Sequence, residues 1–118
     1  MKIIKTNEVP KIPITNPIFT EEVLLQNFVS KDISQIWVIQ VHFNKGARTK
    51  FHTHSSVQVL LVTSGKGIVA TDKEKIVVET GDVVHIAPGE KHWHGATNDH
   101  KFSHIAIMAS DSSDVILE

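Results

Sequence analysis

The sequence predicts an all-β domain, folded as a barrel or a sandwich. Short runs rich in β-branched residues are separated by closely spaced turn signals, and nothing from residue 30 to 110 keeps the 3.6-residue apolar period of a helix. The chain has 118 residues, of which 41% are apolar and 21% charged, as is ordinary for one globular domain with a single core.

The domain is expected to span residues 19–110, between an arm and a tail. Residues 1–18 contain three of the four prolines. Because proline has no backbone N–H, this arm is expected to be extended or an edge strand. Residues 111–118 are polar and then apolar, and this tail either frays or docks on the domain.

Apolar alternation and turn residues place the individual strands. Residues 19–28 fit either a strand or one helical turn, and the pattern leaves this open. Strands are expected at residues 34–44, 51–63 with a bend at 55–56, 67–71, 75–79, 83–86 and 101–109. Turns are expected at residues 44–46, 64–67, 72–74, 80–82 and 88–89.

Charge and composition argue against several classes of function. The formal net charge of −1 gives no electrostatic support for binding nucleic acid or an anionic membrane. The proline-broken N-terminus does not resemble a signal peptide, and no stretch approaches the roughly 20 apolar residues of a membrane helix. The absence of cysteine excludes disulfides and thiolate metal sites and fits a reducing compartment, so we expect a cytoplasmic protein.

Histidine is the unusual residue of this chain, with eight copies against no tyrosine, and half of them lie in two short segments. His52 and His54 are two residues apart, and Gln58 follows in the same segment. Side chains at positions i, i+2 and i+6 of an extended strand share one face. His92 lies in the second segment, which a barrel can fold back over the first. We interpret these four residues as ligands of one metal ion.

The predicted ligand set has chemical consequences. Three imidazoles and one amide oxygen leave one or two positions open for water or substrate, as in a catalytic site. Because the set contains no carboxylate, a divalent ion keeps its full +2 charge, which favours polarisation of an oxygen or stabilisation of an anion over iron–oxygen redox chemistry. The donor types suit manganese, iron, cobalt, nickel or zinc.

Two further histidines are candidates for catalytic proton transfer. His94 follows His92 by two residues, so a continuing strand turns both inward, and His104 lies on the inward face of the last predicted strand. The alternatives are a hydrogen-bonded histidine beside the metal at position 94 and a hydrogen-bonded core histidine at position 104. The substrate pocket is expected to have apolar walls formed by Ile39, Val41 and Met108.

The first histidine segment resembles the first sequence motif of the cupins, G-x5-HxH-x3,4-E-x6-G. The matching residues are Gly46, His52, His54 and Gly65. Gln58 stands in the place of the glutamate.

The second segment resembles the second cupin motif, G-x5-P-x-G-x2-H-x3-N. Gly81, Gly89 and His92 match it, while Ala87 and Ala96 replace the proline and the asparagine. This resemblance, over residues 46–96, implies a conical double-stranded β-helix, the jelly-roll barrel of the cupins. It also implies a metal in the mouth of the barrel and assembly as a homodimer.

A narrower resemblance is to small single-domain bacterial cupins, among them manganese-dependent hydroxynitrile lyases and cupins associated with carboxymuconolactone decarboxylases. It rests on the segments GARTKFHTH, GDVVHIAPGEKHWHGA and SHIAI. The resemblance implies manganese at the four ligand positions, and acid/base roles for His94 and His104.

These features favour an enzyme. The favoured activity is a metal-dependent lyase or isomerase acting on a small hydroxy or carbonyl compound, as hydroxynitrile lyases do. The alternatives are a cupin dioxygenase, a non-catalytic module whose metal anchors a small ligand, and a structural dimer whose metal stabilises the fold. In a dimer, the proline-rich arm is expected to add to the partner's sheet.

Overall fold

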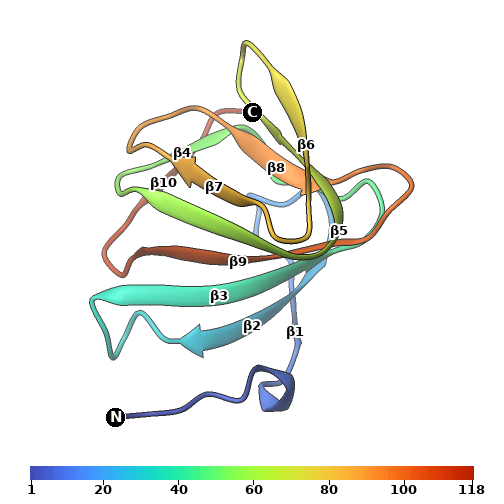
Figure 1. The fold of residues 1–118 in the computed structure, drawn as a ribbon. Coiled ribbons are helices and arrows are strands. Elements are labelled where there is room, and N and C mark those ends of the chain that lie inside the picture. Colours follow the sequence, from blue (N-terminus) through green and yellow to red (C-terminus); the bar gives the residue numbers. More distant parts are fainter.

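The computed structural model describes residues 1–118 and consists almost entirely of strands and their connections (Figure 1). The elements in chain order are η1 (Thr6–Glu8), β1 (Ile12–Ile14), β2 (Val23–Val29), β3 (Ile36–Phe43), β4 (His52–His54), β5 (Gln58–Ala70), β6 (Lys75–Glu79), β7 (Val83–Ile86), β8 (Trp93–Ala96), β9 (Phe102–Ala109) and β10 (Asp114–Ile116). Most predicted strands are confirmed. For residues 19–28 the sequence allowed a strand or a helical turn, and β2 shows that most of this segment is a strand. No helix here is long and apolar enough to cross a membrane.

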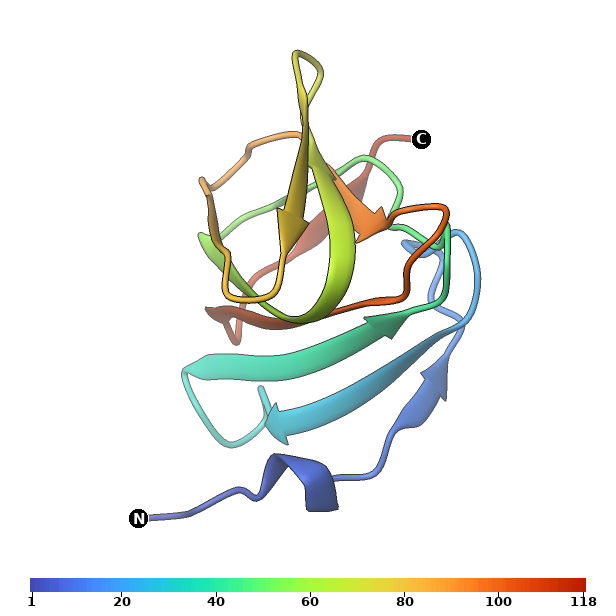
Figure 2. The same cartoon turned by 45° about the vertical axis from the view of Figure 1, so that its right-hand side comes forward.

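The strands form a curled antiparallel sheet (Figure 2). The long strand β5 pairs with different neighbours along its two halves, so it joins two sections of this sheet. The first part of β5 lies between β9 and β7, and β9 continues the sheet through β3 and β2 to β1. The last part of β5 lies between β6 and β8. Because one bent strand serves both parts, the sheet wraps around one core, and the predicted all-β jelly-roll barrel is confirmed.

The turn predicted at residues 64–67 is wrong, because β5 continues through it. The strand bends here instead, and its register against β9 shifts between Val62 and Ser64. Gly65 has a φ of +75°, and a Cβ at this position would lie 1.8 Å from the carbonyl oxygen of Lys101. Gly65 therefore allows β5 to bend and to approach the backbone of Lys101 closely, and it does not reverse the chain direction.

The barrel closes along a seam where residues 46–54 meet the segment that contains β8. His52 forms an isolated antiparallel bridge with His92, and Arg48 forms another with Gly95. The backbones of His52 and His92 exchange two hydrogen bonds of 2.9 and 3.1 Å. This seam sets the two histidine-containing segments side by side.

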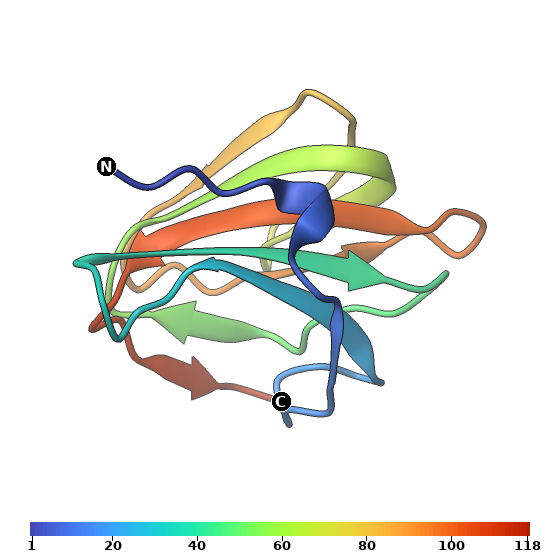
Figure 3. The same ribbon diagram turned by 90° about the horizontal axis from the view of Figure 1, so that it is seen from below.

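Segments near both ends of the chain run alongside strands of the barrel (Figure 3). Strand β1 pairs with β2 of its own chain, and exchange of the arm with a partner's sheet stays a prediction. The buried Gln26 side chain of β2 donates to the carbonyl oxygens of Thr6 and Val9, at 2.9 Å each. At the other end, β10 pairs with β4, so the tail docks.

The inward face of the sheet carries both the apolar core and a group of polar side chains. Phe43, Leu60 and Phe102 are each at most 2% exposed and belong to one apolar cluster. His104 of β9 points to the same side and is also fully buried. Burying a polar group is costly unless it is paired, so these inward histidines require hydrogen-bond partners or a bound ion.

Candidate metal centre and adjoining cavity

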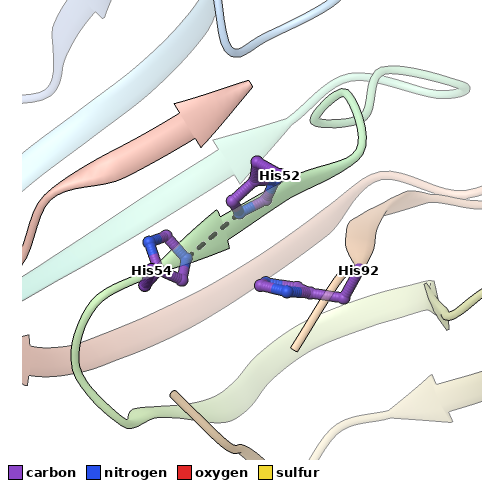
Figure 4. A group of neighbouring side chains, drawn as sticks. All are labelled: His52, His54 and His92. Atoms are coloured by element: carbon purple, nitrogen blue, oxygen red, sulfur yellow. Dashed lines mark hydrogen bonds between the residues drawn. The ribbon is translucent and has the colours of Figure 1, made fainter. Parts of the chain in front are cut away.

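Three histidine side chains meet at the seam of the barrel (Figure 4). His52 and His54 lie on β4 and His92 just before β8, and each is at most 6% exposed. One ring nitrogen from each lies within 4.8 Å of the others, and the Nε2 atoms of His52 and His54 are 3.1 Å apart. Two nitrogens about 2.1 Å from one ion, at right angles, are about 3 Å apart. The three histidines are therefore placed to bind a metal.

Hydrogen bonds behind the rings direct the free lone pairs inward. In His52 and His92, Nδ1 lies 2.7 and 2.8 Å from the carbonyl oxygen of the residue two positions earlier. A carbonyl oxygen only accepts, so these Nδ1 atoms carry the proton and the Nε2 atoms present lone pairs. Nδ1 of His54 is held in the same way by Oδ1 of Asp114, at 2.6 Å. A cation between the three facing lone pairs would relieve their mutual repulsion.

Burial keeps the imidazoles of His52 and His92 neutral, as metal ligands must be. Desolvation is the largest influence on His52 and His92, and it lowers the pKa of each to about 4. The hydrogen bond from His54 lowers the pKa of Asp114, which keeps that carboxylate ionised as an acceptor. Near pH 7 the Nε2 atoms of His52 and His92 are therefore free to bind a cation.

Gln58, the fourth predicted ligand, is buried at the start of β5 and lines the same cavity as His52 and His54. Its Oε1 has no hydrogen-bond partner, and neither has the Nε2 of His92. Buried polar atoms are normally paired, and an ion shared by these two atoms would satisfy both. The residues therefore fit a divalent metal, and a set of imidazole nitrogens and an amide oxygen does not by itself select one metal.

A second pair of histidines lies next to the three predicted ligands. Nδ1 of His94, on β8, and Nε2 of His104, on β9, are 3.0 Å apart, so one ring donates to the other. The ring centroid of His94 lies 5.7 Å from those of both His52 and His92. Desolvation lowers the pKa of His94 well below its usual value and that of His104 to about 3. The pair is therefore neutral near pH 7.

A cavity of about 290 Å³ adjoins both groups of histidines. His52, His54, His94 and His104 contribute to its lining, whereas His92 does not. The three residues predicted as apolar pocket walls all line it, namely Ile39, Val41 and Met108.

Both ends of the chain contribute to this cavity, and sequence reasoning missed these contributions. The arm supplies Ile14, Asn16 and Ile18, and the tail supplies Asp114. Further apolar lining comes from Phe19, Leu25, Trp37 and Ala106. Neither end carries a recognisable motif, so only the fold shows that they reach the site.

The chain is similar in sequence to known proteins. Residues 39–108 match the model of the Cupin_2 family, a cupin domain. Over 82 residues the chain is 41% identical to an (R)-mandelonitrile lyase of Granulicella tundricola. That match covers 69% of this chain and 63% of the relative, so the chain spans less than two thirds of the relative's length.

Solved structures share the fold over almost the whole chain. A cupin-like protein of Thermotoga maritima is 30% identical, with a TM-score of 0.82 over 99% of this chain and 89% of its own. The polyketide cyclase RemF of Streptomyces resistomycificus has a TM-score of 0.85 over 100% of this chain and 87% of its own, but 15% identity, so that likeness shows the fold alone. The family match over more than half of the chain shows that it belongs to the cupins, as a small cupin that resembles the hydroxynitrile lyases.

Proposed function

We propose that this cupin is a metal-dependent lyase that cleaves small cyanohydrins into a carbonyl compound and hydrogen cyanide. The observation that carries the proposal is the neutral His94–His104 pair, which adjoins the three predicted ligand histidines. A site that only anchors a ligand or stabilises the fold needs no second pair of buried imidazoles. The sequence similarity to an (R)-mandelonitrile lyase supports the same reaction class.

The proposed metal ligands are His52, His54, His92 and Gln58. The ring nitrogens of the three histidines lie close together. Oε1 of Gln58 and Nε2 of His92 have no hydrogen-bond partner. When bound, a divalent ion, manganese in this proposal, supplies Lewis-acid stabilisation of negative charge on a substrate oxygen or a departing anion.

The proposed proton transfers use His94 and His104. Cleavage of a cyanohydrin breaks the bond between the carbinol carbon and the nitrile carbon, and the hydroxyl oxygen forms the new carbonyl group. His94, next to the predicted ligands, takes the hydroxyl proton. His104, bonded to His94 at 3.0 Å, orients that ring. The pair then returns the proton to cyanide, so both histidines end the cycle neutral.

The cavity supports a small substrate with an apolar substituent. Its walls include Ile39, Val41 and Met108, and aromatic rings are supplied by Phe19 and Trp37. Apolar walls with a few convergent polar groups are typical of small-molecule sites. We propose that the apolar substituent lies against these walls and that the hydroxyl group points to the histidines.

The test is cleavage of mandelonitrile with added manganese by the wild type and by His94→Ala and His104→Ala. Loss of a positioned acid or base is expected to reduce kcat by about 10²–10⁴-fold. The matched control is His85→Ala, which removes an exposed histidine of β7 and should leave the rate unchanged. Metal content is measured for every variant by elemental analysis. Equal rates in all four proteins would contradict the proposed roles.

We also propose a homodimer that forms through the outer face of the sheet. Register across β7, β5, β9 and β3 aligns an outward apolar stripe made of Val83, Leu61, Ile105, Val59, Ile107 and Val38. Val83 is 66% exposed, and Leu61 and Ile107 are each 37% exposed. A second copy would cover one such stripe with an identical one about a twofold axis. Leu61→Lys is expected to give a monomer in gel filtration, and an unchanged elution volume would contradict this interface.

A further inference from the structure

We propose that Asp114 is a positioning residue for the metal, so that the C-terminal strand β10 forms part of the metal site. The inference rests on the metal ligands named in the proposed function. Its subject is the carboxylate behind His54, which lies outside both histidine segments of the sequence.

The contact follows from the way in which the tail docks. Strand β10 pairs with β4, and the register places Asp114 opposite His54. Oδ1 of Asp114 lies 2.6 Å from Nδ1 of His54. The His54 side chain is 5% exposed and that of Asp114 is 48% exposed, so the carboxylate connects a buried ring to the surface.

The other two rings are held by backbone carbonyl oxygens instead of a carboxylate. His52 and His92 donate Nδ1–H to carbonyl oxygens, which no substitution can remove. His54 alone depends on a side chain for this hydrogen bond. An ionised carboxylate is also a stronger acceptor than a carbonyl oxygen, so it fixes the tautomer of the ring and raises the basicity of its Nε2.

The carboxylate also changes the charge around the ion. The four predicted ligands are neutral, but Asp114 adds one negative charge behind His54. An imidazole that donates to a carboxylate transmits part of that charge to the metal it binds. Asp114 is therefore expected to strengthen binding of a divalent cation without occupying a coordination position.

The competing explanation is that the His54–Asp114 contact only fastens the tail. The chain offers a matched control, because Glu118 fastens the same tail elsewhere. The Glu118 carboxylate accepts from Nη2 of Arg48 at 2.8 Å and from the backbone N–H of Phe51, and it does not contact a predicted ligand. Glu118→Gln weakens tail docking and leaves His54 untouched, whereas Asp114→Asn removes the charge behind His54.

The experiment measures affinity for Mn²⁺ and Zn²⁺ by chelator competition for the wild type, Asp114→Asn and Glu118→Gln. Loss of the partner behind a ligating histidine is expected to weaken binding by about 10–100-fold in Asp114→Asn. Glu118→Gln is expected to bind within about twofold of the wild type. Nitrogen-15 NMR of metal-free protein gives a second readout: His54 is expected to be protonated at Nδ1 in the wild type and to gain Nε2-protonated form in Asp114→Asn. Because Asp114 is half-exposed on a terminal strand, Asp114→Asn is expected to fold.

The outcomes separate this inference from the proposed function. Wild-type affinity in Asp114→Asn, or an equal loss in Glu118→Gln, would overturn the role of Asp114 while metal binding by the wild type still stands. Failure of the wild type to bind either ion would overturn the proposed metal site, and the role of Asp114 with it. Weaker binding in Asp114→Asn, without cyanohydrin cleavage by the wild type, would support the role of Asp114 and contradict the lyase proposal.

Discussion

Gly95 and Arg48 lie opposite each other at the seam of the barrel, and a Cβ added to Gly95 would lie 2.3 Å from the Cβ of Arg48. It would also lie 2.5 Å from the carbonyl oxygen of Ala47. Only glycine allows β8 to approach this closely. Since His92 precedes Gly95 by three residues, the same approach brings His92 to the histidines of β4.

Gly95→Ala is therefore expected to lower the free energy of unfolding and to weaken metal binding together. Forcing a methyl group into this contact should cost about 1–3 kcal/mol, because backbone must move on one side of the seam. Urea denaturation and metal titration measure the two effects. The control is Gly81→Ala, where φ is +94° but a Cβ would meet nothing within 4 Å. That variant should lose about 1–2 kcal/mol from backbone strain alone and keep its metal affinity. Unchanged metal affinity in Gly95→Ala would contradict the link between seam and site.

Gln58→Glu is expected to bind divalent metal more tightly than the wild type. A carboxylate at this position would attract the ion, and it would also reduce the positive charge available to polarise a substrate oxygen. Lyase activity should fall while metal affinity rises, measured by chelator competition and initial rates. Gln35→Glu, in an exposed connection, adds the same charge and should change neither quantity. Weaker metal binding in Gln58→Glu would argue against Gln58 as a ligand.

The metal-free protein is expected to lose stability in acid. Folding lowers the pKa of His52 and His92 from 6.5 to about 4, and that of His104 to about 3. Above pH 6.5 these histidines are neutral in both states. Below pH 6.5 the unfolded chain binds protons that the folded chain does not. Each of these histidines therefore lowers the free energy of unfolding by about 1.4 kcal/mol for each unit by which the pH falls, until the pH reaches the pKa of that histidine in the folded protein.

Urea denaturation from pH 7.5 to 5, with chelator present, checks this dependence. His104→Leu removes one of the buried histidines. Unfolding of this variant should take up about one proton fewer below pH 6.5, so the free energy of unfolding should change by about 1.4 kcal/mol less per pH unit. A stability that stays flat over this range would show that the buried histidines are not neutral in the folded protein.

Removal of residues 1–17 is expected to raise KM for an apolar substrate and to leave metal affinity unchanged. The truncation deletes β1, Ile14 and Asn16, and thus part of the cavity wall, but no predicted ligand. Substrate kinetics and chelator competition measure the two effects. Gel filtration of the same protein tests whether arms exchange between chains. Retention of the full-length protein's elution position, apart from the lost mass, would exclude that exchange.

The sequence was informative wherever a local rule decides the structure. Alternation in residues 34–44 and 101–109 predicted strands β3 and β9, because a half-buried strand must alternate its side chains. The HxH spacing on β4 placed His52 and His54 on one face for the same reason. The prediction at residues 64–67 was wrong because serine and glycine favour a turn and a strand bend alike, and only the neighbouring strand β9 distinguishes them.

Three features could be predicted from the amino-acid sequence alone: the all-β class, the three histidines placed for a metal, and the apolar cavity residues Ile39, Val41 and Met108. These depend on strand periodicity and on two motifs of fixed spacing. Three other features emerge only from the folded chain: Asp114 lies behind His54, the arm forms part of the cavity wall, and His94 is hydrogen-bonded to His104. Each of these contacts joins segments whose meeting depends on how β5 bends and where the seam closes. A pattern confined to a few neighbouring residues carries no information about such a closure.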